Sequence, residues 1–382
     1  MIMSGKKIYY KLMRSGRKSF FILLFASSVL ISFSIGQKDN VAHHYLYVAT
    51  PGIRNYLQYG GHGLLVYDLD HDFRLVKRIP TGGLDKNGQP SNVKGICANA
   101  ATHRMYISTL ESLICIDLLT EKKRWEKLYD GGCDRMAISP DGKIIYLPTL
   151  EGNDWKVLDA ETGDIISTIS PHSGSHNTIY GQDGKKVYLE GLHSLYLTMV
   201  NTADHRIIDS VGPFSNFIRP FTINGKQTIC FVNLDGLLGF EMGDLKSGKK
   251  IGHVEVNGFH AGPVKRHGCP SHGIALTPDE KEIWLADGFN ESIHIFSLEN
   301  GKAEQRETIK LHDQPGWITF SIDGKLAFPS SGEVIDVKKR KILSRLMDEK
   351  GNYVQSEKMV EIDFTGSVPV GAGDQFAMGR IR

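Results

Sequence analysis

The chain lacks the short motifs that mark several large enzyme classes. It has no G-x-S-x-G elbow, which argues against an α/β-hydrolase triad, and no G-x-G-x-x-G or P-loop sequence to hold a nucleotide phosphate. It has no C-x-x-C-H sequence, so covalent c-type haem is not expected. After residue 36, no segment keeps an apolar period of 3.6 residues over about 12 residues, which excludes a helical fold.

Cysteine is scarce as well. The chain has five cysteines, an odd number, and their spacing matches neither a disulfide framework nor a zinc motif. Buried or isolated thiols are therefore expected. If an oxidising compartment allows one bridge, the pair we expect is Cys133 with Cys269.

Most of the chain also lacks an excess of positive charge. The net charge of +2 becomes −4 when the six basic residues of positions 1–36 are left out, so nucleic-acid binding is not expected. Residues 1–36 contain a basic stretch, the apolar run FFILLFASSVLISF and then Ser34-Ile35-Gly36, the pattern of a secretory signal cleaved before Gln37. We expect a periplasmic or secreted mature protein with no membrane span. An uncleaved N-terminal anchor is the alternative.

Glycine, in contrast, is abundant, with 41 residues among 382, and a pattern of short strands and turns returns along the chain. Residues 134–168 read DRMAISPDGKIIYLPTLEGNDWKVLDAETGDIIST, which is four alternating strands joined by turns, the pattern of one propeller blade. Similar units open at Lys94, His176, Arg219, His272 and Gly316. The steps between the starts lie near the about 40 to 50 residues of propeller repeats.

A seventh blade is predicted from the two ends of the repeat region. Near the N-terminus, HYLYVATPG and HGLLVYDLD look like middle and outer strands without an inner strand, and the C-terminal DQFAMGRI looks like the missing inner strand. Joining them closes a ring and hides the open sheet edges. The prediction is an all-β fold in which residues 37–382 form a single seven-bladed β-propeller with four-stranded antiparallel blades.

The repeats resemble a known family. SPDGKIIYLP with VLDAETGDIISTI, TPDEKEIWLAD with IHIFSLENG, and SIDGKLAFP with VIDVKKRKIL are similar to the YVTN-type β-propeller repeat, also seen in propellers related to the bacterial YncE proteins. The resemblance covers the chain from about His44 onward. It implies the fold and leaves the function open, because such propellers serve as binding modules, scaffolds and enzymes.

Polar residues gather where the inner strands begin. In a propeller these strand starts converge on one mouth of the central channel, and converging titratable groups in a concavity are typical of a ligand site. Aligning the strands on Ile96, Met136, Thr178, Phe221, Ile274, Ile318 and Phe376 places Lys94, Asp134, His176, Arg219, His272, Gly316 and Asp374 two residues earlier. One residue earlier stand Gly95, Arg135, Asn177, Pro220, Gly273, Trp317 and Gln375.

This ring of side chains predicts a small anionic or carbohydrate ligand in the central funnel. The guanidinium group of Arg219 can bind a carboxylate. His176 and His272 titrate near neutrality and can act as base or acid. These three are the candidate catalytic residues. By analogy with propeller polysaccharide lyases, the chemistry would be β-elimination on a uronate. The candidate ligand-binding residues are Lys94, Asp134, Arg135, Asn177, Trp317, Asp374, Gln375 and His62.

Two other interpretations stay open. The ring residues can instead hydrogen-bond one another in a non-catalytic binding or assembly module. The other interpretation is a metal-dependent, lactonase-like hydrolase, since the insertion FHAGPVKRHGCPSHG carries His260, His267, His272 and Cys269. The spacing of these histidines matches no known metal motif, so no cofactor is assigned and a divalent metal is an alternative. The protein is expected to act as a monomer.

Overall fold

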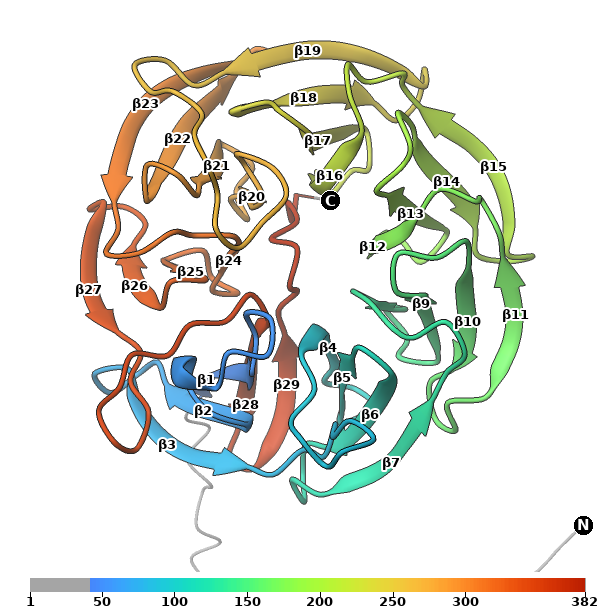
Figure 1. Ribbon diagram of the computed structural model, residues 1–382, viewed down its shortest axis with the longest axis vertical. Helices are drawn as coiled ribbons and strands as arrows, with labels where there is room; N and C mark the ends of the chain where they lie inside the picture. Colours follow the sequence, from blue (N-terminus) through green and yellow to red (C-terminus); the bar gives the residue numbers. More distant parts are fainter. Residues whose placement is uncertain (1–41, 382) are drawn as a thin grey trace, which may run out of the picture. The chain divides into compact units, whose positions relative to one another are not determined.

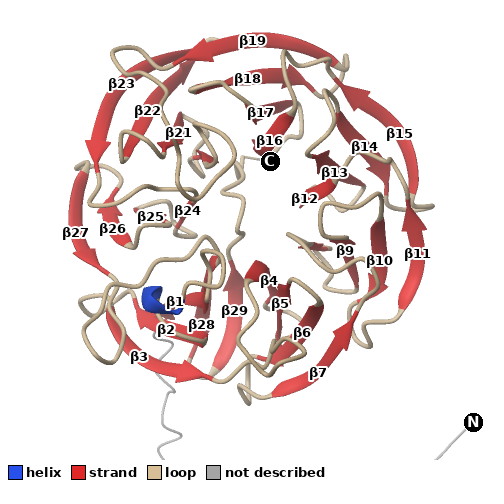
Figure 2. Ribbon diagram, in the orientation of Figure 1, coloured by secondary structure: helices blue, strands red, loops and turns tan. Residues whose placement is uncertain are grey.

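The computed structural model describes residues 42–381, so the predicted signal peptide lies outside the described residues. Seven antiparallel sheets stand around a central axis as the blades of a propeller (Figure 1), and strands with connecting loops make up almost all of it (Figure 2). The predicted fold class is confirmed. Within residues 42–381, the one helix is the short 3₁₀ turn η1 (Leu57–Tyr59), and no helix has the length and apolar character to cross a membrane.

Six blades are continuous in sequence and contain four strands each, ordered from the axis to the rim. The first three are β4 (Val93–Asn99), β5 (Arg104–Thr109), β6 (Ser112–Asp117) and β7 (Lys123–Leu128); β8 (Ala137–Ile138), β9 (Ile144–Pro148), β10 (Trp155–Asp159) and β11 (Ile165–Ile169); and β12 (Ser175–Tyr180), β13 (Lys186–Gly191), β14 (Leu197–Asn201) and β15 (Arg206–Val211). The next three are β16 (Ile218–Ile223), β17 (Ile229–Leu234), β18 (Gly239–Asp244) and β19 (Lys249–Glu255); β20 (Ile274–Leu276), β21 (Glu282–Asp287), β22 (Ser292–Glu299) and β23 (Lys302–Lys310); and β24 (Ile318–Phe320), β25 (Leu326–Pro329), β26 (Glu333–Asp336) and β27 (Lys341–Arg345).

The seventh blade joins the two ends of the described chain. Its five strands follow the order β29 (Val368–Ala372), β28 (Met359–Thr365), β1 (Ala42–Thr50), β2 (Gly63–Asp68) and β3 (Arg74–Ile79). With β3 at the rim, β28 occupies the place of an inner strand and pairs with β1 from Val48↔Met359 to Ala42↔Thr365. The ring is therefore closed by hydrogen bonds between segments more than 300 residues apart.

The predicted closing strand was the wrong segment. The residues of DQFAMGRI form no strand; after β29 they leave the sheet and run into the centre of the ring (Figure 1). There Gln375 accepts a hydrogen bond from Ile96 N and donates one to Met136 O, and Ala377 O accepts from Thr222 Oγ1 and Leu276 N. Phe376 and Ala377 of this segment are buried in the channel, which is why the pattern resembled an inner strand.

The turns between inner and second strands repeat one hydrogen-bond pattern, as the SPDGK, TPDEK and SIDGK sequences predict. Asp141 accepts a hydrogen bond from Ser139 Oγ at 2.6 Å, and the same bond joins Thr277 to Asp279 and Ser321 to Asp323, both at 2.8 Å. A short carboxylate that bonds back to its own turn favours a tight reversal over a longer loop.

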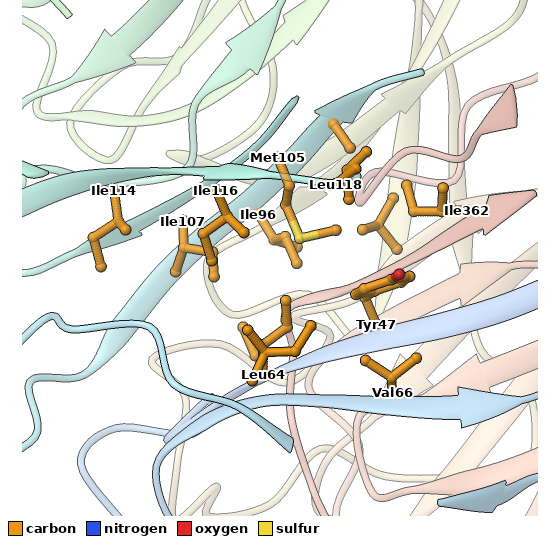
Figure 3. Close-up of a cluster of buried hydrophobic side chains, with 14 of the residues drawn as sticks. Tyr47, Leu64, Val66, Ile96, Met105, Ile107, Ile114, Ile116, Leu118 and Ile362 are labelled. Atoms are coloured by element: carbon orange, nitrogen blue, oxygen red, sulfur yellow. The ribbon is translucent and has the colours of Figure 1, made fainter. Parts of the chain in front are cut away.

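The core lies between neighbouring blades, where the apolar faces of adjacent sheets pack together. Figure 3 shows one such cluster at the closure, in which Tyr47, Leu64, Val66 and Ile362 of the seventh blade face isoleucines of β4, β5 and β6. On the other side of the seventh blade, Leu46 and its neighbours pack against residues of β25 and β26. Both flanks of the closing blade therefore bury apolar surface, the main stabilising term in folding.

The expected Cys133–Cys269 bridge is not formed. All five cysteines, which are Cys97, Cys115, Cys133, Cys230 and Cys269, are buried and carry free thiols. Cys133 packs between the blades that contain β4 and β8, whereas Cys269 hydrogen-bonds Ser271 O before β20. The two lie in different parts of the ring, which sequence spacing alone did not reveal.

Truncating Phe376 tests the placement of the C-terminal segment in the channel. Phe376 is buried against Trp317, with ring centroids 5.8 Å apart, so Phe376→Ala should leave a cavity and destabilise the fold by about 3–5 kcal/mol in chemical denaturation. Val370→Ala on β29, which removes a side chain 56% exposed, is the control and should change stability by less than about 0.5 kcal/mol. Equal effects would place residues 373–381 outside the channel.

Candidate functional site

The starts of the inner strands converge so closely that some positions accept only glycine. A Cβ atom at Gly95 would lie 3.0 Å from Arg135 Cα, and one at Gly273 would lie 2.8 Å from Trp317 Cα. A parallel bridge joins Arg135 to Asn177. These contacts link residues that the alignment of strand starts places beside one another, in successive blades. We call this end of the channel the mouth.

The first group at the mouth is a buried carboxylate with two partners. Asp134 Oδ2 lies 2.7 Å from His176 Nδ1 and 3.3 Å from Lys94 Nζ. Burial raises the pKa of Asp134, but the charges of His176 and Lys94 outweigh burial and lower the pKa to about 2. Burial lowers the pKa of His176. At neutral pH the imidazole is therefore neutral, with Nδ1–H donating to Asp134 and Nε2 left as a base.

The second group is centred on Glu357, in the segment that leads into β28. Its Oε2 atom accepts a hydrogen bond from Arg135 and another from Lys358 Nζ at 2.8 Å, and its Oε1 atom lies 3.2 Å from His267 Nδ1. Burial raises the pKa of Glu357, but Lys358 and His267 hold it well below its usual value. Burial lowers the pKa of Lys358 to about 7 in spite of the neighbouring carboxylate.

Aromatic rings pack beside this group. The rings of His267 and His272 are stacked with centroids 4.5 Å apart and an interplanar angle of 20°. His272 also lies 6.0 Å from Trp317, and the guanidinium carbon of Arg135 stands 4.0 Å above the Trp317 ring. Trp317 donates its indole N–H to Gln375 O. Trp317 is buried among Arg135, His272 and Phe376, so it fills part of the channel behind the mouth.

The third group contains two further carboxylates. Arg219 donates two hydrogen bonds, of 2.5 and 2.9 Å, to the Asp235 carboxylate. The two-pronged side of its guanidinium group is therefore already occupied. Glu190, which is fully buried, accepts a bond of 2.5 Å from Asn177 Nδ2. Burial raises the pKa of Glu190 to about 8, so this carboxyl is mostly protonated near neutral pH.

Several buried polar atoms at the mouth have no hydrogen-bond partner within residues 42–381. They are Arg135 Nε, Asn177 Oδ1, Glu190 Oε1 and both amide atoms of Asn233, at the end of β17. An unsatisfied buried polar group costs about 1–3 kcal/mol, and such groups are rare in folded proteins. Their concentration in one place requires an explanation, and a polar ligand or bound water is the usual one.

The predicted site residues divide into two sets. Lys94, Asp134, Arg135, His176, Asn177, Arg219, His272 and Trp317 lie together at the mouth. His62 does not share their contacts: its Nε2 atom bonds Gly82 O, 2.7 Å away. Asp374 and Gln375 belong to the C-terminal segment, where Asp374 accepts bonds from Phe376 N and Met378 N.

Asp374 and Gln375 also line a cavity of about 690 Å³. Its other lining residues include Asn99, Pro140 and Gln182, which follow or end the inner strands, so the cavity lies at the end of the channel opposite the mouth. The C-terminal segment separates this cavity from the mouth.

Sequence reasoning missed the centre of the site. Glu357 and Lys358 take the place at the mouth that was assigned to Asp374 and Gln375, because the closing strand was sought too close to the C-terminus. The signal was present: KMVEIDF alternates as an inner strand should, and the two charged residues precede that alternation as in the other blades. Glu190 and Asp235 come from second strands or their ends, which the alignment of inner strands did not include.

Comparisons with known proteins support the fold and assign no family. No protein-family model matches the sequence, and no curated protein matches it. Among solved structures, 1677 chains match, so the fold alone selects no function. One of them is hydrazine synthase of Kuenenia stuttgartiensis, 14% identical with a TM-score of 0.56, over 74% of this chain and 88% of that chain. The resemblance to the YVTN-type repeat stays a prediction.

The Asp134 charge should stabilise the fold in a pH-dependent way. Because the folded-state pKa is lowered from 3.8 to about 2, the stabilisation is present above pH 3.8 and is lost as the pH falls through 2. We expect Asp134→Asn to cost about 2 kcal/mol in urea unfolding at pH 7, and the difference from wild type to shrink between pH 4 and pH 2. Exposed Asp204→Asn is the control. A cost that stays constant down to pH 2 would contradict the ion-pair assignment.

Proposed function

We propose that this protein is an exported β-propeller that binds a small anionic ligand, of the acidic-sugar class, at the mouth of its ring. The observation that carries the proposal is the set of partnerless buried polar atoms among charged groups that sum to a positive charge. The N-terminal 36 residues support export, and the repeats support membership of the YVTN-type propellers.

The charge balance favours an anion. Lys94, Arg135 and Arg219 oppose three anionic side chains, and Lys358, with a pKa of about 7, adds a partial positive charge near neutral pH, where Glu190 is mostly protonated. Lys94 and Arg219 keep 14% and 19% of their side-chain surface exposed, so the surplus charge reaches solvent at the mouth. The cations are Lys94, Arg135, Arg219 and Lys358, and the anions are Asp134, Asp235 and Glu357.

The rim of the mouth supports a sugar over a simple inorganic anion. Phe217, two residues before Arg219, is 40% exposed and pairs edge-on with His193 at 6.2 Å. An exposed aromatic ring offers a flat apolar surface on which one face of a sugar ring can pack. Lys94 is the better partner for the carboxylate, because it contacts Asp134 through one ion pair of 3.3 Å, whereas Asp235 holds the guanidinium fork of Arg219 through two hydrogen bonds.

A second candidate function, uronate lyase, is favoured by the His176–Asp134 pair. A neutral imidazole oriented by a buried carboxylate is the arrangement of a general base. In a β-elimination this base would remove the proton beside the uronate carboxylate, the C–C bond would become a double bond, and the glycosidic oxygen would leave with the electron pair of the broken C–O bond. Lys94 would stabilise the negative charge that develops on the carboxylate.

Binding is tested with trigalacturonate, using neutral maltotriose as the comparison sugar. We expect calorimetric binding of trigalacturonate by the wild type, at least tenfold weaker binding by Lys94→Gln, and weakening of both at high salt. The matched control is Lys339→Gln, because Lys339 is an exposed lysine in the turn between β26 and β27. If wild type and Lys94→Gln bind trigalacturonate equally, or neither binds it, the acidic-sugar proposal fails.

Lyase activity is tested by ultraviolet absorbance, because elimination creates an unsaturated uronate. Incubation with polygalacturonate or alginate should raise the absorbance in wild type, and His176→Gln should reduce the rate by a factor of about 10²–10⁴, the usual contribution of a general base. Exposed His260→Gln should leave it unchanged. Binding without any new absorbance would leave a binding protein and remove the lyase.

A further inference from the structure

The mouth contains a cluster of potential metal ligands that the proposed function does not use. His267, His272 and Glu357 each offer one ligand atom, and these three atoms lie within 4.8 Å of one another. His267 and His272 come from the insertion before β20, and Glu357 comes from the segment before β28. Two elements far apart in sequence therefore bring two imidazoles and a carboxylate to one point.

The hydrogen bond of His272 fixes which of its nitrogens is free. Its Nδ1 atom lies 2.9 Å from Gly316 O, and since a carbonyl only accepts, Nδ1 carries the proton and donates it. The Nε2 atom is then the one with a lone pair. A ligating histidine commonly donates its other N–H to a backbone carbonyl in this way, which fixes the tautomer and the ring orientation.

The carboxylate of Glu357 is held for a similar role. Arg135 and Lys358 both bind its Oε2 atom, which leaves Oε1 facing the imidazoles. Oε1 lies 3.2 Å from His267 Nδ1. Two ligand atoms on a tetrahedral zinc ion, at bond lengths of about 2.0–2.2 Å, are separated by about 3.3 Å, so this pair is already spaced as two ligands of one ion.

The donor set of the cluster agrees with this geometry. The chemistry of two imidazoles and one carboxylate suits zinc and similar divalent transition metals better than calcium or magnesium.

We propose that His267, His272 and Glu357 form a binding site for one divalent transition-metal ion of the zinc class, with a coordination position left open toward the mouth. The site stands on these three side chains and does not depend on the acidic-sugar ligand. Arg135 and Lys358 bring positive charge close to the ion and weaken its binding. We therefore expect lower affinity than in structural zinc sites, and a metal that a chelator removes without unfolding the protein.

The test uses the purified full chain after chelator treatment and dialysis. Calorimetric titration with zinc chloride should show about one equivalent bound, and cobalt(II) chloride should give visible absorbance bands stronger than those of the free hydrated ion. His267→Gln and His272→Gln should each weaken zinc binding at least tenfold and remove the cobalt bands. His260→Gln, in the same insertion but exposed, is the matched control and should behave as wild type.

The melting temperature without metal shows that each variant is folded, and should one histidine variant fail to fold, the other carries the test. Zinc should raise the melting temperature of wild type and of His260→Gln, but not that of either site variant. Equal zinc binding by wild type and the His267→Gln/His272→Gln double variant would overturn the proposal, as would a wild-type cobalt spectrum no stronger than that of the hydrated ion. Trigalacturonate binding, measured with chelator present, is a separate result and fails or succeeds independently.

Discussion

The pairing of β28 with β1 is the interaction on which the rest of this structure depends. A propeller whose last blade is not completed leaves two open sheet edges and an exposed apolar face on each side of the gap. Here the pairing joins the ends of the described chain, and both flanks of the seventh blade bury apolar clusters against their neighbours. The same strand begins just after Glu357 and Lys358, so closing the ring also delivers these two charges to the mouth. The same strand pairing therefore closes the ring and positions two charged side chains of the site.

The electrostatics of the mouth follow from burial. A charge removed from water is costly unless an opposite charge and hydrogen bonds compensate it, and each buried carboxylate here meets that condition differently. Asp134 is balanced by Lys94 and by the hydrogen bond from the neutral His176, Glu357 by Arg135 and Lys358, and Glu190 by taking up a proton. Because Glu190 is neutralised by a proton and not by a cation, the partly protonated Lys358 leaves a small surplus of positive charge. The surplus that favours an anion is thus a consequence of how one carboxyl is buried.

The sequence predicted the fold to the level of blades, because strand alternation and the Ser-Pro-Asp-Gly type of turn are local signals that survive in every repeat. It also predicted which inner-strand starts meet, since Lys94, Asp134 and His176 contact one another in the order of the alignment. It failed where the signal is not local. Phe376 and Ala377 are buried in the channel, and in the sequence a phenylalanine buried there looks the same as a phenylalanine in a strand. Glu190 and Asp235 were not predicted because second strands reach the mouth only through the geometry of the blade.

The C-terminal segment also determines what kind of site the mouth can be. Gln375 bonds to β4 and to Met136 just before β8, and Ala377 bonds to β16 and β20. Asp374 O accepts a bond from Thr319 on β24, so the C-terminal segment is hydrogen-bonded to five blades. Trp317, bonded to the same segment, lies beside Arg135 and His272 and fills part of the channel behind the mouth. The contacts of Trp317 and of the C-terminal segment therefore support the imidazoles and cations of the mouth from within the channel. Side chains held by such neighbouring contacts keep their separations, which is what selective binding of an ion or a small acid requires.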